Sequence, residues 1–464
     1  MKEWLKVTFN IKIPVNANKL INILQQAGYS AYVVGGCVRD SILGRTPHDW
    51  DICTSATPTE MLKVFNDFQI IETGLQHGTI TIMVDGEGYE ITTFRIDGEY
   101  SDNRRPDCVI FTGKLEEDLS RRDFTINALA YNDVEGLIDP FGGVTDIKNR
   151  LIRCVGNAWD RFDEDALRVL RALRFSCQLG FAIEYDTSAA VLDKAHLLSK
   201  ISKERINSEF CKMLCTKNFA TIMSLYNTVF CQFIPTINDM VNFDQKNPAH
   251  KYLLWRHTAS AINHCDSLDL ITRLAVFFHD FGKPYCYQED IEGFRHFKGH
   301  GKVGAEIVDE LMVSLKFDNK TRNAVTTLVY YHDSPLEVDA ASIKRWLNKL
   351  GVEQFKRLLA VRVADIKGSR HDYDIERLIK ITKIEENLGK ILYNDECYSL
   401  TDLAVNGSDL IALGIHPGTY IGRTLNDLLQ LVINGEIENN KEALLNTILS
   451  NNNDLFYYLQ EDLL

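Results

Sequence analysis

The feature that most constrains this chain is a short apolar strand that runs directly into two glycines. Residues 31–35 form an apolar run that predicts a buried strand, and Gly35 and Gly36 lie where this strand should pass into a helix. Glycine lets backbone N–H groups approach a phosphate closely, the helix N-terminus adds partial positive charge, and Arg39 can fork onto phosphate oxygens. Two glycines after a strand also occur in a simple tight turn, so a binding site needs a second feature.

Two carboxylates supply that second feature, in the sequence Asp49-Trp50-Asp51. In an extended segment, residues two apart point to the same face, so both carboxylates should meet at one point. They repel each other unless a cation lies between them, and Mg²⁺ is an oxygen-preferring ion that usually shares itself with substrate phosphates. Such a metal stabilises attacking and leaving oxygens in phosphoryl transfer. The alternative is that the two aspartates lie in an exposed loop, and the nearby glycine pair argues against this alternative. Glu90, on a later predicted strand, is a candidate third carboxylate.

Length and composition fit a protein of two to four globular domains. The chain has 464 residues, 45% hydrophobic and 25% charged, as folded domains usually have. Its net charge of −13 opposes indiscriminate nucleic-acid binding, so any RNA site should be a local basic patch. The 11 cysteines form no Cys-x-x-Cys pair, the N-terminus lacks a signal-peptide core, and no apolar run approaches the roughly 20 residues of a membrane helix. We therefore expect free thiols and a soluble, cytoplasmic protein that contacts no membrane.

The pattern of apolar residues predicts an α+β fold in four parts. The first part, residues 1–150, should be a head with a small mixed β-sheet, because a helix at 17–27 precedes strand-like runs at 79–84, 89–94 and 109–111. The turn residues 85–88 predict a hairpin between the first two of these runs. The later parts should be all-α: a neck (151–245), a histidine-bearing domain (246–375) and a tail (376–464).

Three segments of the head together resemble one known family. Gly-Gly-Cys-Val-Arg-Asp at residues 35–40, followed by the paired aspartates, resembles the class II tRNA nucleotidyltransferase and bacterial poly(A) polymerase superfamily. Asp-Leu-Ser-Arg-Arg-Asp-Phe-Thr-Ile-Asn-Ala-Leu at residues 118–129 is similar to its second motif, which is associated with ribose recognition. Asp-Pro-Phe-Gly-Gly at residues 139–143 is similar to its third motif. The first part is therefore expected to be a nucleotidyltransferase head.

The resemblance also implies roles for particular residues. Asp49 and Asp51 would be the catalytic residues and would hold Mg²⁺. Gly36 and Arg39 would contact the incoming triphosphate, and Arg122 would contact the nucleotide.

A row of charged side chains lies on a predicted helix at residues 164–175. Asp165, Arg168, Arg171 and Arg174 recur every third residue and follow one slowly drifting face. The arginines repel one another unless an anion such as a triphosphate neutralises them, and a solvated basic face is the alternative. A carboxylate accepts from the exocyclic amino group of cytosine or adenine, and a guanidinium donates to a ring nitrogen or to cytosine O2.

The family resemblance gives this row a role in choosing the base. In that superfamily a Glu-Asp-x-x-Arg motif selects the nucleotide, which implies that Asp165 and Arg168 bind the base. Arg171 and Arg174 would then contact phosphate or nucleotide nearby.

Two further segments are expected to support base selection. Residues 201–210 resemble a fifth motif of the family, in which Arg205 and Glu209 are expected to be structural ion partners. Residues 95–107 are charged and glycine-bearing, as mobile loops are, and match the flexible loop that the family uses to switch from C to A. An inert surface loop is the alternative.

Histidines and aspartates in the third part predict a second metal site. His279 and Asp280 follow an apolar run, and burial of both is costly without a metal such as Mn²⁺, Ni²⁺, Fe²⁺ or Zn²⁺. The order His257, His279-Asp280, Asp365 resembles the HD phosphohydrolase superfamily, which implies that metal-activated water attacks a phosphoester such as a 2′,3′-cyclic phosphate at an RNA end. A domain that only docks tRNA is the alternative. His300 and His332 are similar to further positions in some HD proteins, and Lys283 is expected to contact phosphate.

Taken together, the resemblances imply an enzyme that adds C and A nucleotides to the tRNA 3′ end without a nucleic-acid template. CTP and ATP would be substrates, Mg²⁺ the cofactor of the head, and Mn²⁺, Ni²⁺ or another divalent ion the cofactor of the histidine site. No DNA partner is expected. One alternative is an enzyme that adds only A, either to tRNA or as a poly(A) polymerase. The other is an HD phosphohydrolase whose head is an RNA-binding module.

Overall fold

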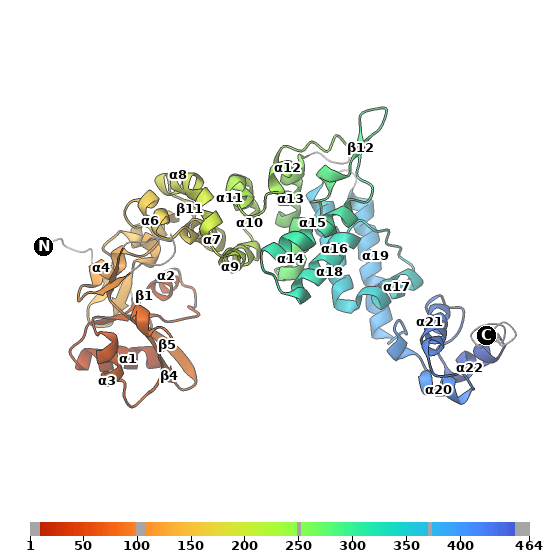
Figure 1. The fold of residues 1–464 in the computed structure, drawn as a ribbon, viewed down its shortest axis with the longest axis horizontal. Helices are drawn as coiled ribbons and strands as arrows, with labels where there is room; N and C mark the ends of the chain where they lie inside the picture. Colours follow the sequence, from red (N-terminus) through yellow and green to blue (C-terminus); the bar gives the residue numbers. More distant parts are fainter. Residues whose placement is uncertain (1–9, 99–107, 248–251, 370–373, 451–464) are drawn as a thin grey trace. The chain divides into compact units, whose positions relative to one another are not determined.

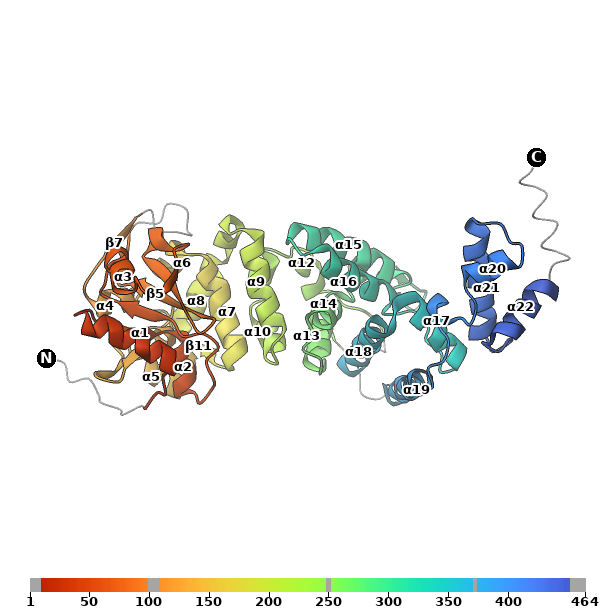
Figure 2. The same ribbon diagram turned by 90° about the horizontal axis from the view of Figure 1, so that it is seen from below.

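The computed structural model describes residues 10–98, 108–247, 252–369 and 374–450. The chain forms two compact units: unit 1 comprises residues 1–238 and 314–317, and unit 2 comprises residues 239–313 and 318–464. Figures 1 and 2 show the elements of each unit. The four-part division expected from the sequence is finer than these two units and stays a prediction. Among the described residues, no helix is both long and apolar enough to span a membrane.

A seven-stranded mixed sheet is the main β-structure of unit 1 (Figure 1). In spatial order its strands are β3 (Gln69–Ile71), β4 (Thr79–Val84), β5 (Glu87–Thr93), β2 (Ile52–Thr54), β1 (Ala31–Val34), β8 (Ala130–Asn132) and β9 (Gly136–Ile138). The pair β2–β5 is parallel and the other neighbours are antiparallel. Every residue of β1 is buried, as its apolar sequence requires.

The strand register places the sequence motifs of the head side by side. Since β1 and β2 run antiparallel, the end of β1 that leads into the glycine pair lies beside the start of β2. The backbone N–H of Val34 donates to the carbonyl oxygen of Asp51 at 3.0 Å. In the parallel pair β2–β5, Ile52 lies opposite Ile91, so the residue before β2 comes to the level of Glu90.

Helices and short strands complete unit 1. The head adds α1 (Val15–Gln26), α2 (Gly36–Ile42), α3 (Pro58–Val64), η1 (Leu75–His77), β6 (Arg95–Asp97), β7 (Val109–Phe111), α4 (Leu115–Ser120), η2 (Thr125–Asn127) and α5 (Gly143–Asn149). The helical part consists of β10 (Leu151–Ile152), α6 (Ala158–Glu164), α7 (Leu167–Leu179), β11 (Ala182–Ile183), α8 (Tyr185–Asp193), η3 (Lys194–Lys200), α9 (Lys203–Leu214), α10 (Phe219–Leu225) and α11 (Asn227–Cys231). The next helix, α12 (Ile237–Val241), spans the boundary between the units.

Unit 2 is mainly helical. Its elements after α12 are α13 (Leu254–Asn263), α14 (Leu270–Phe278), η4 (Lys283–Tyr285), β12 (Gln288–Glu289), β13 (Arg295–His296), α15 (His300–Ser314), α16 (Asn319–Tyr331), α17 (Ala340–Leu350), α18 (Val352–Gly368), α19 (Asp374–Tyr393), η5 (Leu400–Asp402), α20 (Gly407–Ala412), α21 (Thr419–Ile433) and α22 (Lys441–Ser450). The segment after α19 has an apolar core of its own, in which Leu410, Leu429 and Leu444 are fully buried.

The elements predicted for the head are present. The helix expected at 17–27 is α1, and the strands expected at 31–35 and 109–111 are β1 and β7. The expected hairpin is the antiparallel pair β4–β5, whose turn contains Gly86 at φ 84°, a conformation that glycine adopts without strain. The α+β class is therefore correct.

Two predictions for the helical parts need correction. The single helix expected at 164–175 is broken, because α6 ends at Glu164 and α7 begins at Leu167. Asp165 has an extended backbone there, and its side chain accepts a hydrogen bond from the N–H of Leu167 at 3.1 Å, which stabilises the start of α7. The parts expected to be all-α also contain two short sheets, β10–β11 and β12–β13.

A buried ion pair joins the head to the helical part of unit 1. Asp123 is 8% exposed and accepts hydrogen bonds from Arg171 Nε at 2.8 Å and from Asn127 Nδ2 at 3.1 Å. Burial alone would raise the pKa of Asp123, but the charge of Arg171 and the hydrogen bonds from Asn127 and Arg171 lower it to about 2. The carboxylate therefore stays ionised and holds α7 against the segment after α4.

The close packing of α5 gives a first prediction. A Cβ atom on Gly143 would lie 2.2 Å from the carbonyl oxygen of Thr125, and backbone cannot yield as a flexible side chain can. We expect Gly143→Ala to lower the free energy of unfolding by about 1–3 kcal/mol in urea denaturation. Gly113→Ala is the matched control, because nothing lies within 4 Å of its Cβ position. Equal stability of the two variants would contradict the observed packing.

The Asp123–Arg171 pair gives a second prediction. Its contribution is fully present above the pKa of an unfolded aspartate, about 3.9, and is lost as the pH falls through the folded value of about 2. We expect Arg171→Gln to lower the free energy of unfolding by about 2 kcal/mol at pH 6, with the difference from the unsubstituted chain shrinking below pH 4. Urea denaturation at several pH values measures it. Lys114→Gln removes an exposed ion pair with Glu117 and should lower the free energy of unfolding by less. If the difference in unfolding free energy between the two chains did not change with pH, the lowered pKa of Asp123 would be wrong.

Candidate functional site

Three carboxylates lie near one another beside the glycine pair, where β1 ends and β2 begins, next to the middle of β5. Asp49 and Asp51 precede β2, and Glu90 lies on β5 at the level of Asp51. Desolvation raises the pKa of Asp51, the charge of Arg122 opposes the rise, and the Glu90 and Asp49 carboxylates add to it. Two neighbouring carboxylates therefore act on Asp51 at the place where the sequence predicts a cation. Carboxylate oxygens are the ligands that Mg²⁺ prefers.

Gly35 and Arg122 are packed against each other on one side of these carboxylates. Gly35 has φ 82°, and a Cβ atom there would lie 3.1 Å from Arg122 Nη1, so a larger residue would displace the guanidinium. Arg122 Nη2 lies 3.3 Å from Asp118 Oδ2, and Arg122 Nε is buried with no hydrogen-bond partner among the described residues. The glycine thus makes room for a cation beside Asp51, as a site for a nucleotide phosphate requires.

Arg39 lies behind the glycine pair and is already bound by the protein. Its Nη1 donates to Asn127 at 2.6 Å, and its Nε and Nη2 each donate to Asp40 at 2.9 Å. The guanidinium also stacks on Phe175, 5.1 Å from the ring centroid. Arg39 is therefore fixed next to Gly36, where the sequence predicts that the triphosphate binds.

The two predicted base-reading residues lie at the junction of α6 and α7, and each has a protein partner. Arg168 Nη1 donates to Glu164 at 2.6 Å, and Asp165 accepts from Arg205 at 3.2 Å. Arg168 Nη2 also donates to the carbonyl oxygen of Arg121 at 3.0 Å, one residue from Arg122. This hydrogen bond links the junction of α6 and α7 to the segment that contains Arg122.

The structure corrects one argument about the arginine row. The sequence suggested that these arginines need a bound anion, but a carboxylate neutralises each of them. Arg171 pairs with Asp123 at 2.6 Å, and Arg174 pairs with Glu209 at 2.5 Å. Glu209 and Arg205 thus have the structural pairing expected of them, whereas contact of Arg171 and Arg174 with a nucleotide stays a prediction.

Asn127 is a residue that sequence reasoning did not single out. It accepts a hydrogen bond from Arg39 at 2.6 Å and donates one to Asp123 at 3.1 Å, so it couples the glycine pair to the ion pair with α7. Its sequence context could have indicated a role, because Asn127 is a polar residue between the apolar residues Ile126 and Ala128. The structure shows that it is buried. The predicted specificity loop at 95–107 lies mostly outside the described residues and stays a prediction.

In unit 2 the four predicted HD ligands come together. His257 on α13 and His279 at the end of α14 place their Nε2 atoms 3.1 Å apart. Asp280 Oδ2 lies 3.3 Å and 3.1 Å from these two atoms, and Asp365 Oδ1 on α18 lies 3.1 Å from His257 Nε2. Although burial lowers it, hydrogen bonds and charges from Asp280 and Asp365 raise the pKa of His257 to about 9. Histidines and carboxylates in this arrangement are a ligand set for a borderline divalent metal.

Two more histidines reach the same cluster. His300 at the start of α15 and His332 at the end of α16 have Nε2 atoms 3.0 Å apart and face the other oxygen of Asp280, at 3.4 and 3.7 Å. Lys283 Nζ lies 2.8 Å from Asp280 Oδ2. Asp333, which follows His332 in the chain, is exposed and only marginally close to His300 Nδ1, at 4.0 Å.

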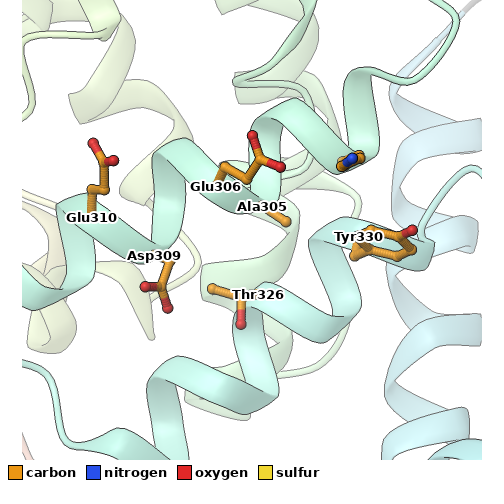
Figure 3. Close-up of a pocket in the computed structure, with 7 residues that line it drawn as sticks. Ala305, Glu306, Asp309, Glu310, Thr326 and Tyr330 are labelled. Carbon is orange, nitrogen blue, oxygen red and sulfur yellow. The ribbon is translucent and has the colours of Figure 1, made fainter.

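A separate pocket of about 430 Å³ lies between α15 and α16 (Figure 3). The side chains around it include Glu306, Asp309, Glu310, Thr326 and Tyr330. Three carboxylates repel phosphate, so this pocket does not suit a nucleotide.

Three protein-family models match parts of this chain. The poly(A) polymerase head-domain model matches residues 31–153, a model for an RNA-binding site of polymerase A matches residues 180–240, and a model for domain 2 of tRNA nucleotidyltransferases matches residues 300–448. The CCA-adding enzyme of Leuconostoc mesenteroides is 36% identical over 434 residues, which cover 93% of this chain and 94% of the relative. That of Geobacillus kaustophilus is 33% identical over 443 residues, 93% of this chain and 96% of the relative.

Solved structures agree with these relatives. The CCA-adding enzyme of Bacillus stearothermophilus in complex with CTP superposes with a TM-score of 0.72 at 30% identity, covering 96% of this chain and 100% of that one. The Thermotoga maritima CCA-adding enzyme complexed with tRNA shares the fold, with a TM-score of 0.61 at 21% identity and coverage of 94% of each chain. Nucleotidyltransferases of this kind use divalent metal ions. With its carboxylates beside the glycine pair and its likeness to these relatives over more than nine-tenths of its length, the chain belongs to the CCA-adding enzyme family.

Proposed function

We propose that this chain adds C and A nucleotides to the 3′ end of tRNA from CTP and ATP, releases pyrophosphate, and acts in the cytoplasm. The observation that carries the proposal is that Asp49, Asp51 and Glu90 lie near one another beside the glycine pair and Arg122. A structural relative that binds CTP and another that binds tRNA support the substrates.

The carboxylates fit a metal, and the other groups fit a triphosphate. Asp49 and Asp51 would hold Mg²⁺, which when bound lowers the pKa of the RNA 3′-OH and offsets charge on the leaving pyrophosphate. The neighbouring carboxylates support this fit, because burial raises the pKa of Asp51, the charges of Glu90 and Asp49 raise it further, and a bound cation would offset those charges. Arg122 would donate to phosphate oxygens while the 3′ oxygen forms its bond to the α-phosphorus and the bond from that phosphorus to the β-phosphate oxygen breaks.

Base choice would reside at the junction of α6 and α7. The Asp165 carboxylate accepts from the amino group of cytosine or adenine, and the Arg168 guanidinium donates to a ring nitrogen or to cytosine O2. Uracil and guanine present the wrong groups there, at a cost of about 1–3 kcal/mol for each buried group left unpaired. Asp165 binds Arg205 and Arg168 binds Glu164 within the protein, so a base would compete with these two charged partners.

A second activity is favoured by a separate observation, the convergence of His257, His279, Asp280 and Asp365 in unit 2. We propose that this cluster holds a divalent metal and hydrolyses a phosphoester at an RNA end. A water oxygen would form a bond to phosphorus while the ester P–O bond breaks, and the water proton would pass to the leaving oxygen.

The first activity is tested with labelled CTP and ATP and Mg²⁺. We expect C and A to enter tRNA trimmed of its 3′ end, only A to enter tRNA that ends in CC, and neither to enter generic RNA. Asp49→Asn and Asp51→Asn should each reduce incorporation by about 10³-fold or more, because they remove the charge that would hold the metal. The unfolding free energy of both variants should remain near that of the unsubstituted chain.

Asp67→Asn is the matched control, since Asp67 is exposed in the same unit, and it should leave incorporation unchanged. Full incorporation by the double variant would refute the metal site. Extension of generic RNA by A alone would instead identify a poly(A) polymerase.

Base selection is tested with Asp165→Asn and Arg168→Lys. Asparagine can still cap α7, and lysine keeps the charge, so folding should survive while the hydrogen-bond pattern changes. We expect the preference for CTP and ATP over UTP and GTP to fall by about 10–100-fold, with a smaller loss in kcat for the preferred nucleotides. Asp160→Ala, at an exposed position on α6, should change neither quantity. Unaltered discrimination in both test variants would remove the base-reading role.

A further inference from the structure

Arg39 is held by the protein with part of its hydrogen-bonding capacity unused. A guanidinium has five N–H donors. Hydrogen bonds to described residues use three of them, since Nε and Nη2 each donate to Asp40 and Nη1 donates to Asn127. One N–H on Nη1 and one on Nη2 remain, and a Cβ atom on Gly36 would lie 3.7 Å from Nη2. Because Gly36 has no side chain, it leaves this side of the fixed cation uncovered, and the guanidinium can still donate to a phosphate oxygen.

Asn127 fixes Arg39 from within the head. Its Oδ1 accepts a hydrogen bond from Arg39 Nη1 at 2.6 Å, and its Nδ2 donates one to Asp123 Oδ1 at 3.1 Å. The side chain thus stands between a cation and an anion, so it must accept at one end and donate at the other. An amide does both. Aspartate at this position would repel Asp123, and an apolar side chain would leave two buried charged groups each short of a partner.

The aromatic ring of Phe175 on α7 is a second contact of Arg39. The centre of the guanidinium lies 5.1 Å from the ring centroid. Two arginines of α7 lie near the same ring, Arg171 at 5.4 Å and Arg174 at 4.1 Å. Aromatic rings attract cations at such distances. Phe175 is buried and packs against Phe124 with 5.7 Å between the centroids, so the ring is held in place.

Both contacts tie Arg39 to the helix that carries the proposed base-reading arginine. Phe175 belongs to α7, and Asn127 reaches α7 through Asp123, which pairs with Arg171 Nη2 at 2.6 Å. Arg168 lies on the same helix, two turns or about 10 Å before Phe175. The position of α7 therefore determines where Arg39 lies relative to Arg168.

We infer that Asn127 and Phe175 are positioning residues that hold Arg39 for the triphosphate of the incoming nucleotide. Helix α7 then places the groups for both ends of one nucleotide, the base through Arg168 and the triphosphate through Phe175. Asn127 and Phe175 act through Arg39 and not on the reacting atoms. The inference rests on the proposed contact between Arg39 and the triphosphate.

The test measures the two ends of the nucleotide separately on the full-length chain. Isothermal titration calorimetry with Mg²⁺ gives the dissociation constants of inorganic tripolyphosphate, which resembles only the triphosphate, and of adenosine, which resembles only the nucleoside. Phe175→Leu keeps an apolar side chain and both hydrogen bonds of Asn127, and it should weaken tripolyphosphate binding about fivefold while adenosine binding stays unchanged. Asn127→Ala should weaken tripolyphosphate binding about tenfold. In addition of A to tRNA that ends in CC, the KM for ATP should rise in parallel, with a smaller change in kcat.

Double variants show whether the two residues act through Arg39. Arg39→Gln should itself weaken tripolyphosphate binding. In that background Asn127→Ala and Phe175→Leu should have no further effect, because the group that they position is absent. A purely structural role would instead give effects that add to that of Arg39→Gln, and such additivity would overturn the inference.

Phe68→Leu is the matched control, because this ring also has a cation–π contact, with Lys19 Nζ at 5.5 Å, and the variant should leave both dissociation constants unchanged. Circular dichroism shows whether each variant is folded, and Phe175→Leu remains a test if Asn127→Ala does not fold. Unchanged tripolyphosphate binding in Arg39→Gln would refute the proposed triphosphate contact and the inference with it. If Arg39→Gln weakens binding but neither Asn127→Ala nor Phe175→Leu does, the positioning inference alone is wrong.

Discussion

Strand pairing is the constraint on which the head of this protein depends, because it brings acidic side chains near one another. The antiparallel pairing of β1 with β2 and the parallel pairing of β2 with β5 set Asp51 beside the glycine pair and at the level of Glu90, and the charges of Glu90 and Asp49 both raise the pKa of Asp51. Arg122 offsets part of this charge and fits because Gly35 has no side chain. The sheet thus maintains an electrostatic imbalance that a metal ion and its bound triphosphate can relieve.

A second set of ion pairs determines where the base-reading junction lies. Asp123 holds Arg171 of α7, Asn127 ties Asp123 to Arg39, and Arg168 reaches the carbonyl oxygen of Arg121. The segment between α4 and η2 therefore contacts the glycine pair on one side and α7 on the other. A shift of α7 would change both base recognition and the position of Arg122.

Local patterns in the sequence predicted the parts of the site that depend on neighbouring residues. The apolar run before Gly35 and the spacing of Asp49 and Asp51 were sufficient, because strand geometry is local. The carboxylate partners of the arginines were not predictable in this way, since Asp123 is 48 residues from Arg171 and Glu209 is 35 residues from Arg174. The break at Asp165 was also missed, because a charged residue at helical spacing can equally cap the next helix. The second histidine pair required the packing of α14 and α16, which brings His332 to Asp280.

The two proposed centres differ in ligands, and this difference would keep their metals apart. Oxygen ligands in the head favour a hard ion such as Mg²⁺, whereas imidazoles in unit 2 favour a borderline ion. Their chemistry is complementary. Transfer in the head needs a free 3′ oxygen as the attacking atom, and a phosphate on that oxygen blocks the reaction. The hydrolysis proposed for unit 2 would release the hydroxyl that transfer consumes, and would thus turn an RNA end with a phosphate into a substrate for the head.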